Sequence, residues 1–598
     1  MKMIKHIKKI PSFRLLQQHV SLFLTIIQLS IIIFVFIPPI NAQTKLIRIF
    51  EPNDWTKLID SLSKAKMAGI NIYVSLLPPS KTPPICPTCN YSEPYRLDFI
   101  HWAKEIANLS LRYSNLTGYA IEDFQENLNL GYIRQTYIDS MITAGKSINP
   151  RLQFITLHNI YYVDRDASGN GSGSSWANAS KTVSGLPWSS INGGDTVYVS
   201  GGSDSTAYYQ YDAGAGKNYF SKTTTGNPIV ITKGWESGHN GDVYFAQAGS
   251  PAKGYSFDVG ASHNIKLTNL KFNVELAGTD GGAALLLYNC SNIIVDNCQI
   301  TSDGSGFGIY FATCDSITIN NCTITVPPNN STTESDNIHA GNGNGGHIIT
   351  NNKFYNYSYN ATPHTDLIQI GLSGSASNLQ TVIANNFFYY DPPLSTAVGN
   401  GVNVSGSYGD RYLIYNNVFV MHTALSACAI TMYRYDGSKH LSARIYNNTI
   451  VTNMTPAGAI TFISALDTVI IKNNIVVHDS GAREYLGFSG ASINSTTYKD
   501  IDYNHYWSHN PSGGDPYIKD STNHSVSWNT WKGWGYDAHS DTGVVSFANL
   551  LGTNVTDYEP TAGSNCIDTG TPISIFDTDI EGTLRPQRSA WDKGAFER

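Results

Sequence analysis

One pattern of apolar and polar positions returns eight times between about residues 264 and 477. Each copy is a short run of β-branched residues alternating around a polar spot, as in NIIVDNCQI, HIITNNKFY and YLIYNNVFV. Intervals of 24 to 34 residues are typical of a solenoid, because one coil cannot bury its apolar face without a neighbour. Each repeat holds about three strand-length pieces and no helical segment. We therefore predict a mainly β chain with a parallel β-helix.

Asparagine marks the polar spot in every copy. In a stack of coils, equivalent side chains lie ~4.8 Å apart, and asparagine both donates and accepts hydrogen bonds. Asparagine also tolerates the left-handed backbone of a tight corner. We expect one internal ladder with a structural role, made of Asn269, Asn297, Asn321, Asn352, Asn386, Asn417, Asn448 and Asn474.

A second strand precedes each of the later copies, and its alternation separates core from surface. It reads GIYF at 308–311, NIHA at 337–340 and LIQI at 367–370. The residues predicted to face the core are Ile309, Ile338, Ile368, Val402, Ile430 and Ile460. The residues predicted to form one outward stripe are Tyr310, His339, Gln369, Asn403, Thr431 and Thr461. Function is expected on this stripe.

The N-terminus predicts export. Five basic residues precede a mostly apolar run at 20–37, and a small residue follows at a plausible cleavage point. We expect a signal peptide over 1–42; an uncleaved signal anchor is the alternative and the only predicted membrane contact. Either places the rest outside the cytoplasm, secreted or at the cell surface. Only 14% of residues are charged and the net charge is −7, which gives no footprint for nucleic acid. We expect a monomer.

Residues 43–160 alternate between strand-like and helix-like segments. The helical patterns cover Trp55–Met67, Leu97–Tyr113 and Tyr132–Ser147, and such alternation implies parallel strands with crossover helices. This small α/β segment resembles part of a β/α-barrel glycoside hydrolase, covering four of eight units. The resemblance implies that Glu122 and Asp123, at the carboxyl end of a strand, are candidate acids. A small accessory unit or a remnant is the alternative.

The rest of the chain resembles secreted right-handed parallel β-helix proteins of the pectate-lyase-like superfamily, which include polysaccharide lyases and bacterial surface proteins. The resemblance lies in an opening Tyr-Val-Asp strand (162–164) with Trp176, a GDTVYV strand (194–199), and a tail with CIDTG (566–570), DIEG (579–582) and DKGAFE (592–597). It implies a β-helix with its N-terminal cap over 161–497 and a C-terminal cap over 498–598. Residues 498 to about 559 lose the repeat and are expected to cap the last coil.

Eight cysteines in an exported chain invite pairing. Cys290 and Cys298 recur 24 residues later as Cys314 and Cys322, so each pair is expected to stack on adjacent coils. A disulfide and a column of buried thiols both fit that spacing. The CPTC run at 86–89 is either a local disulfide or half of a metal site. Cys428 and Cys566 are expected to be buried.

Candidate chemistry gathers on consecutive coils around residue 339. Aligned on the core isoleucines, Asp336 stacks on Asp366 and His339 on Gln369, while His364 lies just before the second strand and Asn400 takes the Asp position on the next coil. The following coil supplies Tyr433, Arg434 and Lys439. Parity turns Asp336 and Asp366 inward, so a corner ladder that caps turns is the alternative for this pair.

Two reactions fit these residue types. A β-eliminating lyase needs a group that neutralises a uronate carboxylate, which Arg434 or Ca²⁺ held by Asp336 and Asp366 would supply. It also needs a base and an acid, for which His339, His364, Lys439 or a tyrosine are candidates. A glycoside hydrolase would instead use two carboxylates. The sequence lacks the pectate-lyase and polygalacturonase signatures and the Asn-Lys-Ser phrase of the chondroitinase-B and alginate-lyase branch, so the choice stays open.

We therefore predict an exported β-helix protein that binds and cleaves an extracellular polysaccharide in a groove along the solenoid. The predicted catalytic residues are His339, Asp366, Asp336, Arg434 and His364. The predicted substrate-binding residues are Tyr310, Gln369, Asn403, Tyr433 and Lys439. A non-catalytic surface or adhesion protein is the rival class. A third possibility places the activity in the α/β segment.

Overall fold

The chain is described here by a computed structural model that spans residues 1–598. The described residues are 44–49, 53–68, 70–87, 89–122, 124, 127, 132–156, 159–209, 218–247, 254–274, 282–302, 306–328, 334–343, 345–359, 364–372, 379–393, 398–406, 411–422, 428–433, 441–452, 459–463, 466–478, 484–488, 498–508, 517–520 and 524–598. The predicted signal segment, Asp123, Arg434 and Lys439 lie outside them, as does the side chain of Tyr433. No helix within the described ranges combines the length and apolar character that crossing a membrane requires.

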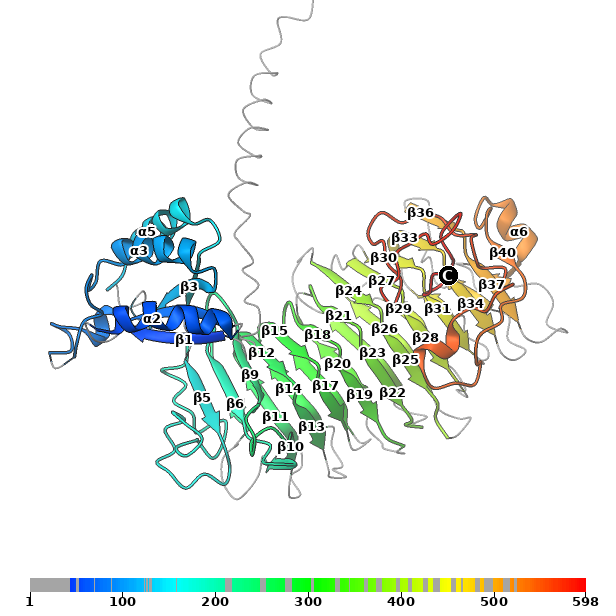
Figure 1. The fold of residues 1–598 in the computed structure, drawn as a ribbon. Helices are drawn as coiled ribbons and strands as arrows, with labels where there is room; N and C mark the ends of the chain where they lie inside the picture. Colours follow the sequence, from blue (N-terminus) through cyan, green and yellow to red (C-terminus); the bar gives the residue numbers. More distant parts are fainter. Residues whose placement is uncertain are drawn as a thin grey trace, which may run out of the picture. The chain divides into compact units, whose positions relative to one another are not determined.

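The chain divides into two compact units between His158 and Asn159, called unit 1 and unit 2. Unit 1 holds a four-stranded parallel sheet in the order β1-β2-β3-β4. Helices alternate with the strands as the sequence predicts (Figure 1). The elements are β1 (Thr44–Ile49), α2 (Asp54–Met67), β2 (Asn71–Leu76), η1 (Pro79–Lys81), α3 (Phe99–Arg112), β3 (Leu116–Ile121), α5 (Gln135–Ile148) and β4 (Gln153–Thr156).

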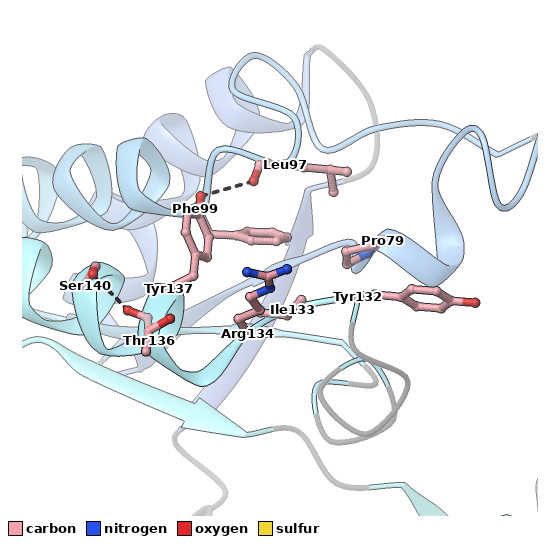
Figure 2. Close-up of a pocket in the computed structure, with 9 residues that line it drawn as sticks. All are labelled: Pro79, Leu97, Phe99, Tyr132, Ile133, Arg134, Thr136, Tyr137 and Ser140. Atoms are coloured by element: carbon pink, nitrogen blue, oxygen red, sulfur yellow. Dashed lines mark hydrogen bonds between the residues drawn. The ribbon is translucent and has the colours of Figure 1, made fainter.

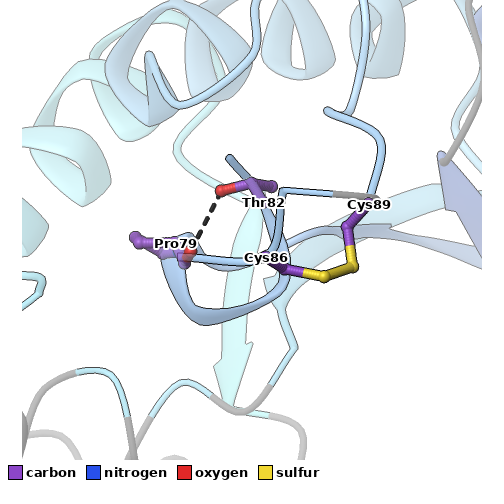
Figure 3. The surroundings of a disulfide bond; sticks show 4 residues. All are labelled: Pro79, Thr82, Cys86 and Cys89. Atoms are coloured by element: carbon purple, nitrogen blue, oxygen red, sulfur yellow. Dashed lines mark hydrogen bonds between the residues drawn. A yellow bond between two sulfur atoms is a disulfide. The ribbon is translucent and has the colours of Figure 1, made fainter. Parts of the chain in front are cut away.

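Unit 1 has its own apolar core. Trp102 and Ile106 of α3 and Met141 of α5 are fully buried with the strand residues beneath them. The CPTC run lies in the turn after η1, where Cys86 and Cys89 form a disulfide (Figure 3). Of the two sequence interpretations, the local disulfide is confirmed and the metal half-site is wrong.

Unit 2 is a parallel β-solenoid, which confirms the predicted fold class (Figure 1). In the described residues each coil adds one strand to each of three 12-stranded sheets. The β5–β36 sheet comprises β5 (Ile160–Val163), β6 (Thr196–Val199), β9 (Ile229–Lys233), β12 (His263–Thr268), β15 (Ser291–Asp296), β18 (Thr318–Asn320), β21 (Ile348–Thr350), β24 (Gln380–Ala384), β27 (Arg411–Tyr415), β30 (Leu441–Tyr446), β33 (Leu466–Lys472) and β36 (Tyr498–Asp502).

The other two sheets repeat this arrangement. The β7–β40 sheet comprises β7 (Ser205–Tyr209), β10 (Asp242–Gln247), β13 (Lys271–Val274), β16 (Gln299–Thr301), β19 (Thr323–Val326), β22 (Lys353–Asn356), β25 (Phe387–Tyr390), β28 (Val418–Met421), β31 (Thr449–Thr452), β34 (Ile475–His478), β37 (His505–Ser508) and β40 (Asp541–Thr542). The β8–β39 sheet comprises β8 (Tyr219–Phe220), β11 (Tyr255–Gly260), β14 (Ala283–Tyr288), β17 (Phe307–Ala312), β20 (Ile338–Gly341), β23 (Thr365–Leu372), β26 (Gly399–Gly406), β29 (Ile430–Tyr433), β32 (Ile460–Phe462), β35 (Glu484–Phe488), β38 (Tyr517–Lys519) and β39 (Ser525–Ser527).

The asparagine ladder is real, but it differs from the prediction in its members. From Asn352 onward, each second asparagine of the pair is buried and donates to the next one through Nδ2–Oδ1 distances of 2.9–3.0 Å. This ladder comprises Asn352, Asn386, Asn417, Asn448, Asn474 and Asn504. Asn269, Asn297 and Asn321 do not belong to it, because the ladder position in their coils holds Leu270, Cys298 and Cys322.

The first asparagine of each pair has a different structural role from the second. The prediction of one ladder did not separate the two positions. It adopts φ between 49° and 59° and so makes the bend between two strands, at Asn351, Asn385, Asn416, Asn447 and Asn473. Asn269, Asn297 and Asn321 occupy this same position, with φ between 51° and 58°. Their side chains form an exposed column, in which Asn297 donates to Asn269 and Asn321 to Asn297.

The remaining six cysteines are free, buried thiols. Cys290, Cys298, Cys314 and Cys322 are buried, and the backbone N–H of Cys290 donates to the Sγ of Cys314 at 3.3 Å. The thiol column is therefore confirmed and the disulfide alternative is wrong. Cys428 and Cys566 are buried as predicted.

The C-terminal region departs from the prediction in two ways. Residues 498–508 and 517–519 do not lose the repeat, because β36, β37 and β38 pair in parallel with the preceding coil. The tail then packs along the outside of earlier coils. Its carbonyls accept hydrogen bonds from the bend asparagines, as with Asn416 to Thr578 at 2.8 Å and Asn473 to Thr571 at 2.7 Å. The sequence shows the tail motif, but it does not show which side chains of the coils bind the tail.

Candidate functional site

The predicted outward stripe is one continuous column on the β8–β39 sheet. Strand pairing places Tyr310 beside His339, His339 beside Gln369, Gln369 beside Asn403, Asn403 beside Thr431 and Thr431 beside Thr461. The flanking core residues are fully buried, as predicted: Ile309, Ile338, Ile368, Val402, Ile430 and Ile460. Alternation therefore turns the column away from the core. The prediction of an exposed stripe holds only in part, because Asn403 and Thr431 are buried.

Asp336 and His339 form the first carboxylate–imidazole pair. Asp336 lies just before β20, and its side chain is 0% exposed, while that of His339 is 17% exposed. The Nδ1 of His339 lies 2.8 Å from Oδ2 of Asp336, and Oε2 of Glu334 lies 3.5 Å from the same nitrogen. The other oxygen of Asp336 accepts the backbone N–H of Asp366 at 2.7 Å. The carboxylate thus ties two coils together and orients the imidazole.

Asp366 and His364 form a second pair, one coil further along the solenoid. Asp366 is also 0% exposed, and its Oδ2 lies 3.1 Å from Nδ1 of His364, whose side chain is 35% exposed. Asn400 and Asn403 of β26 donate to the same carboxylate. The predicted stacking of Asp336, Asp366 and Asn400 on consecutive coils is confirmed. Both aspartates are thus buried where their strands start, and each holds an imidazole that faces outward.

The two imidazoles differ in how their surroundings set their charge. The Asp366 carboxylate raises the pKa of His364 to about 9, and burial opposes this only in part. For His339 burial alone would lower the pKa, but the hydrogen bond and the charges of Asp336, Glu334 and Asp366 outweigh it and raise the pKa. Burial raises the pKa of the Asp336 carboxyl, against the opposing hydrogen bond from His339. The protonated form of His364 is therefore favoured at neutral pH.

Aromatic rings of the neighbouring coil adjoin His339. The rings of Phe307 and Tyr310, both on β17, have centroids 4.4 Å and 5.4 Å from the imidazole centroid. Phe307 and Tyr310 are themselves stacked at 5.4 Å. The imidazole is thus held between an aromatic wall on one coil and a carboxylate at the start of its own strand.

The described residues fit a bound cation poorly. Glu334, Asp336 and His339 bring potential ligand atoms within 4.8 Å of one another. However, the nitrogen that faces both carboxylates is Nδ1 of His339, and a proton on it satisfies them without a metal. The oxygens of Asp336 and Asp366 already accept protein N–H groups, so we derive no step through Ca²⁺.

Sequence reasoning located His339, Asp336, His364 and Asp366 together, and the structure brings them together. It missed Glu334 and Phe307, which lie on the preceding loop and coil without a motif. It also gave Asn400 only an alignment position, although its side chain contacts Asp366. Aligning the coils could have indicated this contact, because equivalent positions of three successive coils hold Asp336, Asp366 and Asn400. Arg434, Lys439 and the side chain of Tyr433 remain predictions.

Unit 1 offers a separate cavity of about 710 Å³, which Figure 2 shows. Phe99, Ile133 and Tyr137 line it together with Arg134 at the start of α5. Glu122, at the carboxyl end of β3, is not among the lining residues. Its side chain is 8% exposed and pairs with Arg48 at 2.8 Å and Lys81 at 3.4 Å, which is the arrangement of a structural ion pair.

No protein-family model matches this chain, and no curated protein matches it either. Among solved structures, the crystal structure of pectate lyase Pel9A is similar at 14% identity and a TM-score of 0.42, over 74% of this chain and 97% of that chain. The crystal structure of a GH136 lacto-N-biosidase from Eubacterium ramulus is similar at 8% identity and a TM-score of 0.34, over 70% of this chain and 75% of that chain. Likenesses at these values do not bear on function, which is argued below from geometry.

Proposed function

We propose that unit 2 binds an extracellular acidic polysaccharide on the β8–β39 sheet and cleaves it by β-elimination at His339 and His364. The observation that carries this proposal is the pair of buried carboxylates on adjacent coils, each holding an imidazole toward the outer face. The predicted export of the chain would place this face where such polymers occur.

The geometry favours elimination over hydrolysis. A glycoside hydrolase needs two carboxyl groups that reach the glycosidic bond. Asp336 and Asp366 are 0% exposed, and their oxygens accept hydrogen bonds from the protein. Neither is free to protonate a leaving oxygen or to attack a sugar carbon. Both imidazoles keep exposed surface, as does Glu334 beside His339, and imidazoles suit proton transfer near neutral pH.

Each imidazole has one role in this proposal. His364 is the cation that binds the uronate carboxylate and neutralises its charge, because its pKa is about 9. His339 is the base: it takes the C5 proton, the C4–O bond breaks, and a C4–C5 double bond forms. The imidazolium of His339 then returns that proton to the departing oxygen, so atoms and charge balance. Asp336 orients the ring and stabilises its protonated form.

The test is a panel of uronate-containing and neutral polysaccharides incubated with the full-length protein. Ultraviolet absorbance of the unsaturated product reports elimination, and new reducing ends report either reaction. We expect both signals on a uronate polymer, and the His339→Ala variant is expected to lose about 10²–10⁴-fold in rate. His539→Ala is the matched control. The imidazole of His539 also pairs with an aspartate, Asp502, at 2.7 Å, but this pair does not belong to the site.

Two outcomes would contradict the proposal. New reducing ends without absorbance would mean hydrolysis. Retention of a polysaccharide on the protein without any product would support the adhesion protein instead, in which the carboxylate–imidazole pairs stabilise the coils.

A further inference from the structure

Asp366 is held by more N–H donors than Asp336, although the two carboxylates occupy equivalent positions on adjacent coils. Its Oδ1 accepts the backbone N–H of Asn400 at 3.0 Å and Nδ2 of the same residue at 2.7 Å. Its Oδ2 accepts Nδ2 of Asn403 at 2.6 Å. Oδ1, which accepts two N–H groups, cannot carry a proton without losing one of these bonds. A buried carboxylate is stable only when such donors compensate its charge.

Asn400 is itself fixed by the next coil, and Asn403 is buried in the strand. The Oδ1 of Asn400 accepts the hydroxyl of Thr431 at 3.0 Å and the backbone N–H of Cys428 at 3.2 Å, so its NH₂ group must face Asp366. Asn403 is 2% exposed and lies between the fully buried Val402 and Val404. The orientation of the Asn400 amide is therefore set before any ligand arrives.

We infer that Asn400 and Asn403 are positioning residues, which hold Asp366 as a carboxylate facing His364, the imidazole that would meet an anionic sugar. The role of His364 toward the sugar rests on the function proposed above, whereas the hydrogen bonds to Asp366 are independent of it. In the described residues Asp336 accepts the backbone N–H of Asp366 but no side-chain amide, which leaves His339 as the member that exchanges a proton. The coil after Asp366 carries Asn400 where the coil after Asp336 carries Asp366. This difference separates the roles of the two imidazoles, with His364 as the cation and His339 as the base.

Other charged and titratable groups also face this pair. Asp336 and Glu334 act on His364 in the same direction as Asp366. Burial raises the pKa of both Tyr390 and Cys428, and the negative charge of Asp366 raises it further. Neither supplies a compensating positive charge. The amides of Asn400 and Asn403 are thus the described neutral groups that favour the charged form of Asp366.

The test follows the titration of His364 by NMR in the full-length protein with isotopically labelled histidine, using His364→Gln to assign the signal. Wild type should titrate with a midpoint of about 9. Asn403→Leu and Asn400→Ala should each raise that midpoint by about one to two pH units, because a carboxylate that has lost a donor, the equivalent of one hydrogen bond to a charged group, depends more on the imidazolium beside it. Gln369→Leu is the matched control, because Gln369 lies in the same column beside Asn403 and should leave the midpoint unchanged.

An unchanged midpoint in folded Asn403→Leu and Asn400→Ala would overturn the inference. If either variant fails to fold, Thr431→Val decides, because it removes only the hydroxyl that fixes Asn400 and should shift the midpoint in the same direction by less. If wild type shows the expected titration but cleaves no polysaccharide, the proposed function fails and the positioning role stands. If it cleaves uronate polymers and the variants titrate as wild type, the positioning role alone fails.

Discussion

Replacing Asn417 by leucine tests the internal ladder that keeps the coils, and hence the site, in register. Asn417 is fully buried. Its Oδ1 accepts both the backbone N–H and the Nδ2 of Asn386 at 3.0 Å, and its own Nδ2 donates to Ile383 O and to Asn448 Oδ1 at 2.9 Å. Leucine has similar size but makes none of these bonds.

The magnitude follows from the groups left without partners. Two N–H donors of Asn386 lose their acceptor, and the carbonyl of Ile383 loses one donor. A buried unsatisfied group costs about 1–3 kcal/mol, so the two N–H groups alone destabilise the protein by about 2–6 kcal/mol. That is a large part of the total stability of a typical domain, about 5–15 kcal/mol.

The assay is urea unfolding of the full-length protein, followed by far-ultraviolet circular dichroism. Asn321→Gly is the matched control, because Asn321 makes one exposed side-chain bond to Asn297 at 3.3 Å and its φ of 53° suits glycine. We expect this control to lose less than about 1 kcal/mol. Equal losses in the two variants would refute the assignment of the second asparagine to the interior and the first to the bend.

How far the sequence predicts this molecule depends on which interactions repeat. The core positions and the outward column could be predicted, because alternation in strands and stacking of coils are strict rules. The division of labour within the Asn–Asn pairs could not, because Asn321 and Asn352 look alike in the text and differ only in which neighbour follows. Cys322, directly after Asn321, holds the ladder position of its coil.

The candidate site divides in the same way. Stacking placed Asp336, Asp366 and His339 together from the sequence. The contribution of Glu334 comes from a loop with no periodicity, and that of Asn403 depends on a side-chain rotation that brings Nδ2 to Asp366. The course of the C-terminal tail along the bend asparagines is likewise a tertiary contact without a local signal.

Three further predictions follow from the structure. His364 gains a partner on folding and its pKa rises to about 9, so its contribution to the free energy of unfolding should be fully present below about pH 6.5 and lost as the pH rises through about 9. After allowance for solvent screening, wild type should lose about 1–2 kcal/mol relative to His364→Gln in unfolding experiments across that window. A constant difference between the two proteins would contradict the ion pair. Glu122→Gln should lower the thermal stability of unit 1, because it weakens the pairs with Arg48 and Lys81, yet leave polysaccharide cleavage within about twofold; loss of cleavage would move the activity to unit 1. Iodoacetamide should label no cysteine of the native protein, six after denaturation and eight after denaturation with reduction, as mass spectrometry would record, and labelling of the native thiol column would contradict its burial.

The central claim is that His339 removes a proton from a sugar whose carboxylate is bound by His364. The most direct measurement is the rate of unsaturated-product formation from a uronate polysaccharide as a function of pH. The rate should rise as His339 loses its proton, above its ordinary value of 6.5, and fall again as His364 loses its proton near 9. The His364→Gln variant should lose the falling limb together with most of the affinity. A rate independent of pH across this range, or a profile unchanged in His339→Ala, would contradict the account.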